Sequence, residues 1–378
     1  MSIFKSHKLY FLLILISSPT IFRTVRSHPV YYERNLNQYT DFYEQLQELL
    51  AIHKNRVASH ENEVNDYPVE VIGWPKNQTF PKGQTAGVDV DSAGRVHVFH
   101  RGDVVWDAKS FDWNNVYQHQ DQPPISVDSV IIFDSKTGDI QNSWGKNRFY
   151  MPHGLTIDKN NNTWLTDVAL HQVFKFKPGA SEPDLVLGQR FVPGNDESHF
   201  CKPTDVAVAS SGKFYVSDGY CNSRILMFSP SGQLLKEFGK KDDMLVPHSL
   251  TLLENLDILC VADRENERIL CYSAGLQGSS PGLLVKNFHK NLGRVFAVAA
   301  RDDHLYMVQG PGIIGKHPVH GLTLSLSTKK ILNSWSPVEG FVNPHDLALS
   351  PDGTSLYVVE IGENAAKKVY KFSLQKPN

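Results

Sequence analysis

The sequence has no excess of positive charge. Its 378 residues contain 38 lysines and arginines against 40 aspartates and glutamates, a formal net charge of −2. Proteins that bind nucleic acid through its phosphates need a basic surface, so this balance predicts no nucleic-acid partner. Long apolar runs are also missing beyond the N-terminus. We therefore expect no membrane span once an N-terminal signal is removed.

Cysteine is scarce, with 4 residues and no Cys-x-x-Cys spacing, which leaves a thiolate metal site as the weaker alternative to disulfides. In an exported chain, four cysteines predict two disulfides. Cys260 and Cys271 flank VADRENERIL, which reads as two strands joined by a polar turn, so we expect them to pair across neighbouring strands. Cys201 and Cys221 then pair by elimination.

The N-terminus predicts export. Lys5 and Lys8 precede an apolar run over 9–16, and small residues follow it, which is typical of a signal peptide. We place this signal peptide at residues 1–27, with an approximate boundary. A longer apolar reading to Phe22 would make a signal anchor instead. The favoured prediction is a protein of the secretory pathway lumen or a secreted protein.

Export also bears on the interpretation of an N-terminal segment and of two sequons. We interpret residues 28–69 as an N-terminal helical segment or pro-segment outside the main fold, because helix-like spacing over 36–58 predicts a helix within it. Asn77 and Asn161 begin the sequons Asn-Gln-Thr and Asn-Asn-Thr, so both are candidate glycosylation sites.

Helical periodicity is scarce after this segment, and a repeat replaces it. Units that begin at residues 86, 153, 204, 248, 296 and 345 each contain a strand, a polar turn, a second strand and a loop, and usually a third strand. Four strands recurring about every 50 residues are typical of propeller blades, whereas a solenoid would need shorter repeats or helices. The sequence predicts an all-β, six-bladed β-propeller over residues 70–378.

Three histidines share one position in this repeat. His153, His248 and His345 lie immediately before the expected first strand of units two, four and six. Alternate blades of a six-bladed ring are about 120° apart, so these side chains should meet on the central axis. Ala86, Thr204 and Phe296 take this position in the other units. Three imidazoles with an open fourth position suit a zinc ion, so we expect a metal site.

The loops after the second strands should lie on the same face. Arg101 and Arg264 occupy equivalent positions there, and Tyr220 lies one place later in its own unit. A tyrosine near arginine and a dication is a candidate general base, because opposite charge favours the phenolate. An arginine fork suits a substrate carboxylate, although Glu265 offers Arg264 a simple ion pair instead.

These motifs resemble a known family. FHRGD, KNRFYMPHGLTIDK, YVSDGYCNSRI, VPHSL and CVADREN are similar to peptidyl-α-hydroxyglycine α-amidating lyase, over roughly residues 70–375. The resemblance implies a propeller of NHL-like repeats. It also implies a lyase that cleaves a peptidyl-α-hydroxyglycine to a C-terminally amidated peptide and glyoxylate, the second step of neuropeptide and peptide-hormone amidation.

The resemblance also implies roles for particular residues. The three histidines match zinc ligands, Tyr220 matches the catalytic base, and Arg101 and Arg264 match active-site arginines. A structural calcium ion would be held by the backbone carbonyls of Val88 and Leu155 and by the Asp346 carboxylate. The disulfides match the pairs Cys201–Cys221 and Cys260–Cys271. Asn343 departs from the family, which has methionine there, and this puts pocket polarity and substrate preference in doubt.

A zinc-dependent lyase is therefore the function that the sequence favours. Its substrates would be made by a separate copper monooxygenase, because no such domain fits in this chain, and we expect a monomer. Two alternatives remain open: a calcium-dependent propeller hydrolase, such as a lactonase, and a non-catalytic interaction propeller. The former would favour Asp, Glu and Asn ligands on the axis, and the latter needs no aligned histidines.

Overall fold

The structure is a computed structural model that describes residues 67–76, 83–312, 319–362, 365 and 367–374. These residues all fall within one compact unit, 65–378. The signal peptide, the expected helix over 36–58 and Asn77 lie outside them and stay predictions. Within the described ranges, no helix is long and apolar enough to cross a membrane.

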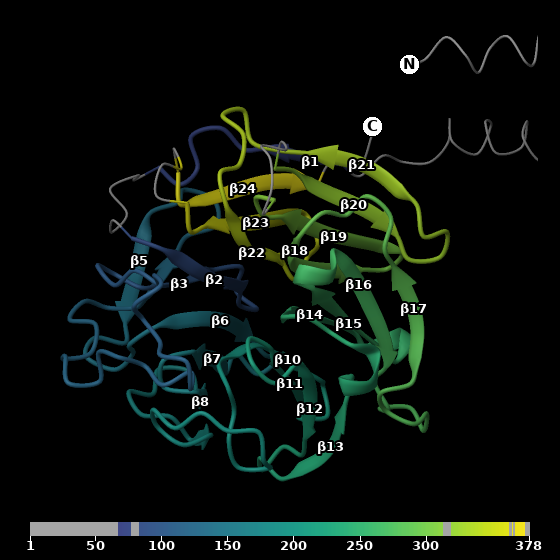
Figure 1. The fold of residues 1–378 in the computed structure, drawn as a ribbon. Helices are drawn as coiled ribbons and strands as arrows, with labels where there is room; N and C mark the ends of the chain where they lie inside the picture. Colours follow the sequence, from purple (N-terminus) through teal and green to yellow (C-terminus); the bar gives the residue numbers. More distant parts are fainter. Residues whose placement is uncertain (1–66, 77–82, 313–318, 363–364, 366, 375–378) are drawn as a thin grey trace, which may run out of the picture. The chain divides into compact units, whose positions relative to one another are not determined.

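The strands form six four-stranded antiparallel sheets arranged around a centre, which confirms the six-bladed β-propeller (Figure 1). Blade 1 contains β2 (Thr85–Val90), β3 (Val96–His100), β4 (Val130–Phe133) and β5 (Ile140–Trp144); blade 2 contains β6 (Pro152–Ile157), β7 (Thr163–Asp167), β8 (Gln172–Phe176) and β9 (Leu185–Leu187); blade 3 contains β10 (Pro203–Val208), β11 (Phe214–Asp218), β12 (Arg224–Phe228) and β13 (Leu234–Phe238). Blade 4 contains β14 (Pro247–Leu253), β15 (Ile258–Asp263), β16 (Arg268–Ser273) and β17 (Leu284–Phe288); blade 5 contains β18 (Val295–Arg301), β19 (His304–Gln309), β20 (Gly321–Ser325) and β21 (Ile331–Trp335); blade 6 contains β22 (Pro344–Leu349), β23 (Ser355–Glu360), β24 (Val369–Leu374) and β1 (Pro68–Glu70). The 3-10 helices among the described residues are η2 (Lys240–Asp242), η3 (Glu254–Leu256) and η4 (Arg264–Asn266).

The chain closes the ring with its own N-terminal strand. β1 pairs with β24, so blade 6 takes one strand from the start of the propeller and three from its end. The propeller therefore begins at Pro68, slightly before residue 70. Glu70 on this strand forms an ion pair with Lys367 at 2.7 Å. Trp74 then packs against Phe133 of blade 1 and Tyr357 of blade 6, which joins the first and last blades.

The hydrophobic core lies between neighbouring blades. One cluster joins Val88 and Val98 of blade 1 to Val359 of blade 6, and another joins Leu165 of blade 2 to Phe99 of blade 1. The middle strands are buried on both faces and read as apolar runs, such as RILMF in β12. Outermost strands such as β5, IQNSW, are largely exposed and polar. This gradient explains why the inner strands of each repeat are easier to recognise in the sequence.

Each innermost strand carries a register shift next to its first residue. In blades 2, 4 and 6 the shift follows Pro152, Pro247 and Pro344. Each histidine is thus the second residue of its strand, at the bulge, rather than just before the strand as the sequence analysis placed it. A bulge locally breaks the pairing and redirects a side chain. The bulge therefore turns this position toward the ring axis.

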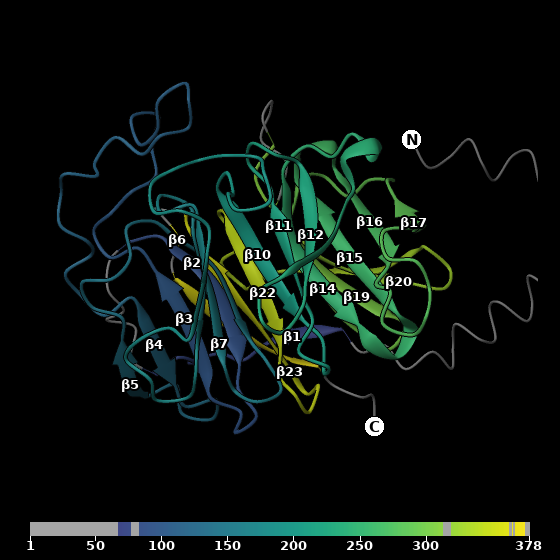
Figure 2. The same ribbon diagram turned by 90° about the horizontal axis from the view of Figure 1, so that it is seen from below.

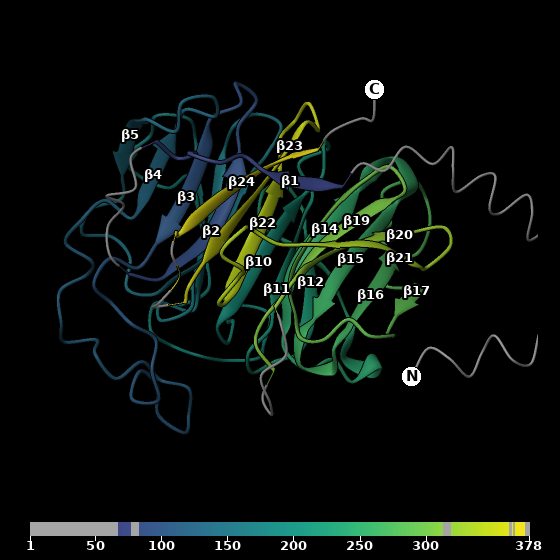
Figure 3. The same ribbon diagram turned by 90° about the horizontal axis from the view of Figure 1, so that it is seen from above.

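The innermost strands of neighbouring blades contact one another all the way around the ring, from β2 to β6 and finally from β22 back to β2. They belong to different sheets, so side chains connect them. The carboxylates of Asp89, Asp205 and Asp346 accept hydrogen bonds from the amides of Ile157, Leu250 and Val88 on the next inner strand, at 2.6, 2.8 and 2.9 Å. Figures 2 and 3 show these strands running from one face of the ring to the other.

Candidate metal centre and active site

The three aligned histidines meet at the centre of the propeller. One ligand nitrogen from each of His153, His248 and His345 lies within 4.8 Å of the others. The three pairs of ring centroids are each 4.7 Å apart, and no side chain in the group is more than 3% exposed. The register seen in the sequence thus corresponds to a triangle of imidazoles on the axis.

Backbone carbonyls from the intervening blades orient each ring. Nδ1 of His153 lies 2.8 Å from the carbonyl oxygen of Thr204, Nδ1 of His248 lies 2.6 Å from that of Phe296, and Nδ1 of His345 lies 2.7 Å from that of Ala86. A carbonyl only accepts, so each Nδ1–H donates. The lone pair must then be on Nε2, which is the arrangement that a metal ligand needs.

Burial keeps these rings uncharged. It lowers the pKa of His153 and of His248 well below the usual 6.5, with smaller effects from neighbouring histidine and arginine charge. It also lowers the pKa of His345 to about 3, assisted by Arg101. Only the neutral imidazole offers a lone pair to a metal, so the site is prepared for a cation at neutral pH.

Tyr220 lies directly against this triangle. Its hydroxyl is 3.0 Å from Nε2 of His153 and 3.2 Å from Nε2 of His248. Arg264 donates to the same hydroxyl from Nη1 at 3.2 Å, while its Nε pairs with Glu265 at 2.7 Å. The ion pair that the sequence offered as the simple explanation for Arg264 is therefore present, and the arginine still reaches the tyrosine.

Arg101 approaches from the other side and is 2% exposed. Its Nε donates to the carbonyl of Pro152 at 2.9 Å, next to His153, and its Nη1 donates to Gln84. Within the described part of the chain, no carboxylate forms an ion pair with it. Burial lowers its pKa to about 10, which leaves it charged at neutral pH. The site therefore contains a buried cation that has no direct ion pair among the described residues, although the buried Asp167 is near enough to raise its pKa slightly.

Trp106 completes the wall above the histidines and was not singled out in the sequence. Its ring centroid is 4.7 Å from that of Tyr220 and 6.4 Å from that of His153. The guanidinium carbon of Arg101 lies 5.3 Å from the Trp106 centroid. No repeat register marks this residue, because it belongs to an extension of the β3–β4 connection that the equivalent connections of blades 2, 3 and 4 lack.

Buried acids at the ends of second strands fix the chain just before each histidine. Asp167 accepts from the amides of Tyr150 and Met151, which precede His153. Asp263 accepts from Leu245 ahead of His248, and Glu360 accepts from Val342 and Asn343 ahead of His345. The side-chain Oδ1 of Asn343 is buried without a partner among the described residues. This places an unsatisfied polar group two residues from His345.

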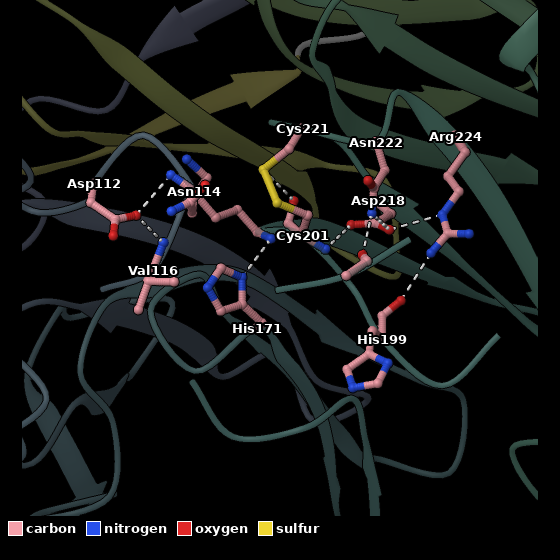
Figure 4. Close-up of a disulfide and its surroundings, with 12 residues drawn as sticks. Asp112, Asn114, Val116, His171, His199, Cys201, Asp218, Cys221, Asn222 and Arg224 are labelled. Carbon is pink, nitrogen blue, oxygen red and sulfur yellow. Dashed lines mark hydrogen bonds and ion pairs between the residues drawn. A yellow bond between two sulfur atoms is a disulfide. The ribbon is translucent and has the colours of Figure 1, made fainter. Parts of the chain in front are cut away.

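The Cys201–Cys221 disulfide holds the loop that carries Tyr220 (Figure 4). The Cys201 amide donates to Asp218 at 2.7 Å, and Asp218 is paired with Arg224, which is 1% exposed. Arg224 also donates to the carbonyls of Asn195, Asp196 and His199. The loop position of Tyr220 is therefore fixed by the disulfide at Cys221 and by the buried Asp218–Arg224 ion pair.

A second cavity lies in the channel on the far side of the histidines. It has a volume of about 230 Å³, and its lining includes Asp89, Asp205, Asp346, Val88 and Leu155. Burial raises the pKa of Asp346 well above its usual value, and the charge of Asp205 adds to this. Burial also raises the pKa values of Asp89 and Asp205 to about 7. Val88, Leu155 and Asp346 were expected here from the sequence, whereas Asp89 and Asp205 were not.

The remaining sequence-predicted residues lie away from the axis. Cys260 and Cys271 face each other on β15 and β16 and form the second predicted disulfide. Asn161 lies in the turn between β6 and β7, where its amide group donates to Ser92 Oγ and its carbonyl accepts from the Ser92 amide. Its glycosylation stays a prediction.

Comparison with known proteins identifies the family. The chain is 45% identical to peptidyl-alpha-hydroxyglycine alpha-amidating lyase 2 of Drosophila melanogaster over 315 residues, which cover 81% of this chain and 76% of that protein. The chain belongs to the peptidyl-α-hydroxyglycine α-amidating lyase family. It is therefore a lyase, which removes the non-catalytic propeller and the lactonase-like hydrolase from consideration.

Two other comparisons agree with this membership. Peptidylglycine alpha-amidating monooxygenase of Rattus norvegicus is 44% identical over 81% of this chain, and the match spans 32% of that longer protein. The NHL repeat family matches residues 200–228. A chain from the solved nidogen/laminin complex aligns with a TM-score of 0.52 at 15% identity, over 71% of this chain and 85% of that chain, and shows the fold alone.

The two disulfides offer a matched test of how Tyr220 is held. We expect Cys201→Ala with Cys221→Ala to lower lyase kcat/KM at least about ten-fold, because the Tyr220 loop loses its cross-link. Cys260→Ala with Cys271→Ala should retain activity. Each pair should lower the free energy of unfolding by about 2–5 kcal/mol. Denaturant titration and steady-state kinetics measure both effects; equal activity losses in the two variants would contradict this account.

Proposed function

We propose that this lyase depends on zinc and cleaves peptidyl-α-hydroxyglycine to an amidated peptide and glyoxylate. The observation that carries the proposal is the Tyr220 hydroxyl, which lies within 3.2 Å of two imidazole nitrogens and of Arg264. The Tyr220 hydroxyl, which is the proposed proton acceptor, thus lies next to both the Arg264 cation and the oriented histidines. The names of the relatives support the choice of substrate.

The residues present fit a zinc ion. Three neutral imidazoles with Nε2 facing the axis match a catalytic zinc site, which uses three protein ligands and an open position. Tyr220 has one hydroxyl proton but faces the lone pairs of both His153 and His248. It can satisfy only one of them, so the other lone pair favours a cation. When bound, zinc would supply Lewis acidity toward a substrate oxygen.

Tyr220 is the residue placed to move the proton. In the proposed reaction Tyr220 acts as the phenolate, and its oxygen accepts the proton of the substrate hydroxyl. The electrons of that O–H bond form the carbonyl of glyoxylate, the C–N bond breaks, and the departing amide nitrogen takes up the proton that Tyr220 accepted. Arg264 donates to the same oxygen and stabilises its negative charge, while Glu265 and Arg294 hold Arg264 in position from behind.

Arg101 is the residue placed to bind the substrate carboxylate. It is a buried guanidinium that lacks a carboxylate partner in the described ranges, and a charged group in such surroundings favours an anion. Trp106 lies against both Arg101 and Tyr220 and would shield the space beside them from water. The carboxylate is present only in the glyoxylate half of the substrate, so Arg101 would distinguish substrate from the amidated product.

A calcium ion in the channel would serve the fold. Val88 and Leu155 would supply their backbone carbonyls and Asp346 its carboxylate, and all three line the same cavity as Asp89 and Asp205. Oxygen ligands of this kind suit calcium. Burial, and to a smaller extent mutual repulsion, raises the pKa values of Asp89 and Asp346, so a divalent ion would stabilise their charged forms.

The cellular setting follows from the same residues. Two disulfides support an oxidising compartment, consistent with the signal peptide predicted at residues 1–27. The rat relative is named as a monooxygenase, and the match spans a third of it. We infer that a separate copper monooxygenase supplies the hydroxylated peptide to this chain, which acts as a secreted monomer.

The role of Tyr220 can be tested with one substitution. We expect Tyr220→Phe to lower kcat for glyoxylate release from an α-hydroxyglycine peptide by about 10²–10⁴-fold, because the ring packing remains while the proton acceptor is lost. Zinc content should be unchanged.

Chelation, or His153→Ala combined with His248→Ala, should also abolish release. Activity that survives the double histidine substitution would refute the metal role.

Calcium binding predicts a stability effect that depends on Asp346. Calcium at about 100 times its Kd should stabilise the wild-type protein by about 2.7 kcal/mol, seen as a rise in Tm. Asp346→Asn should remove most of this rise, because the channel loses a charged ligand. Asp302→Asn, an 82% exposed aspartate in a turn of blade 5, is the matched control and should behave like the wild type. A calcium response that persists in Asp346→Asn would place the ion elsewhere.

A further inference from the structure

The connection between β3 and β4 is a long insertion on the face of the histidines. It runs over residues 101–129, whereas the equivalent connections of blades 2, 3 and 4 run over 168–171, 219–223 and 264–267. In Figures 2 and 3 it extends beyond the ends of the strands, in blue. Insertions in repeat proteins often form the binding face. We call residues 102–121 of this connection the β3–β4 arm.

The tip of the arm is a small, ordered hairpin. Phe111 and Tyr117 form an antiparallel bridge. Between them, Asp112 Oδ1 accepts from the amides of Asn114 and Val116, each at 2.9 Å (Figure 4). These bonds fix the backbone on both sides of residue 113. The hairpin therefore holds the backbone of Trp113 in a defined position.

The inner face of this hairpin is packed onto the propeller. Phe111 lies 5.4 Å from Trp106 and 6.2 Å from His171, and the Lys202 ammonium lies 4.5 Å from the Phe111 centroid. Tyr117 contacts Tyr150 and Phe191. Arg190, which is exposed, lies over the same two rings. Lys202 and Arg190, the basic side chains next to the arm, therefore lie over the aromatic rings beneath it.

The outer face is aromatic and acidic. Trp113, at the tip, is 102% exposed. Exposed charges on the arm are those of four aspartates and one lysine: Asp103, Asp107, Asp112, Asp121 and Lys109. An exposed indole on an arm whose exposed charges are mostly carboxylates attracts a cation both through the ring and through opposite charge. It does not suit an anionic lipid surface, which would favour basic residues.

We propose that the β3–β4 arm binds a lysine or arginine side chain of the peptide substrate, upstream of its α-hydroxyglycine end. This rests on the proposed function and adds a second point of recognition to the same site. Tyr220, Trp106 and Phe111 form a continuous row with centroid spacings of 4.7 and 5.4 Å, and Trp113 follows two residues later. The tip therefore lies within roughly 20 Å of Tyr220, a gap that about six extended residues or fewer span.

Two eight-residue α-hydroxyglycine peptides test this. They differ only in carrying two lysines or two glutamates four and five residues before the end, and glyoxylate release gives kcat/KM for each. We expect the wild type to prefer the lysine peptide about ten-fold at low salt, with the preference in KM. Trp113→Ala should lower this ratio about five-fold, and Trp113→Phe should restore part of it. Asp103→Asn with Asp107→Asn should lower it as well.

The control is Leu256→Ala, which truncates a 48% exposed apolar side chain in η3, at the opposite end of the inner strands. It should keep the full charge preference. Cleavage of both peptides with equal kcat/KM by the wild type would overturn the proposal, while cleavage of neither would instead refute the proposed function. The proposal would also be overturned if the wild type showed no charge preference and Trp113→Ala lost phosphatidylcholine-vesicle binding or dimer formation. The arm would then serve a membrane or a second copy.

Discussion

The hydrogen bond from each histidine Nδ1 to a carbonyl of the next blade is the interaction on which the site depends. His153, His248 and His345 are on blades 2, 4 and 6, and their acceptors are on blades 3, 5 and 1. Every blade therefore contributes either a ring or the carbonyl that orients one. Because the acceptor fixes the tautomer, the same bond that holds each ring also directs its Nε2 lone pair to the axis.

This arrangement requires the ring to be closed and its inner strands to be in register. Closure comes from β1, which completes blade 6, and from Trp74, which packs against both the first and the last blade. Register comes from Asp89, Asp205 and Asp346, each of which bonds to the next inner strand. The aspartates that connect the blades therefore also line the second cavity, so the fold and the proposed calcium site use the same side chains.

Much of this was accessible from the sequence because side chains repeat. The blade count, the histidine register and the positions of Tyr220, Arg101 and Arg264 all follow from alignment of the repeat units, while the two disulfides follow from the strand pair that Cys260 and Cys271 flank. The carbonyls of Ala86, Thr204 and Phe296 could not be found in this way, because a backbone acceptor leaves no mark on residue identity. The bulge that makes each histidine the second residue of its strand was missed for the same reason.

Other features were missed because their signals are ambiguous. Asp89 and Asp205 read as ordinary polar positions of alternating strands, and only the closed ring brings them together with Asp346. Trp106 and Trp113 belong to an insertion present in one blade, so comparison between repeats says nothing about them.

X-ray absorption on the purified protein tests the central claim most directly. The account predicts one zinc per chain with three imidazole nitrogens at about 2.0–2.1 Å and one further light ligand. A site without zinc, or one with sulfur ligands, would contradict it.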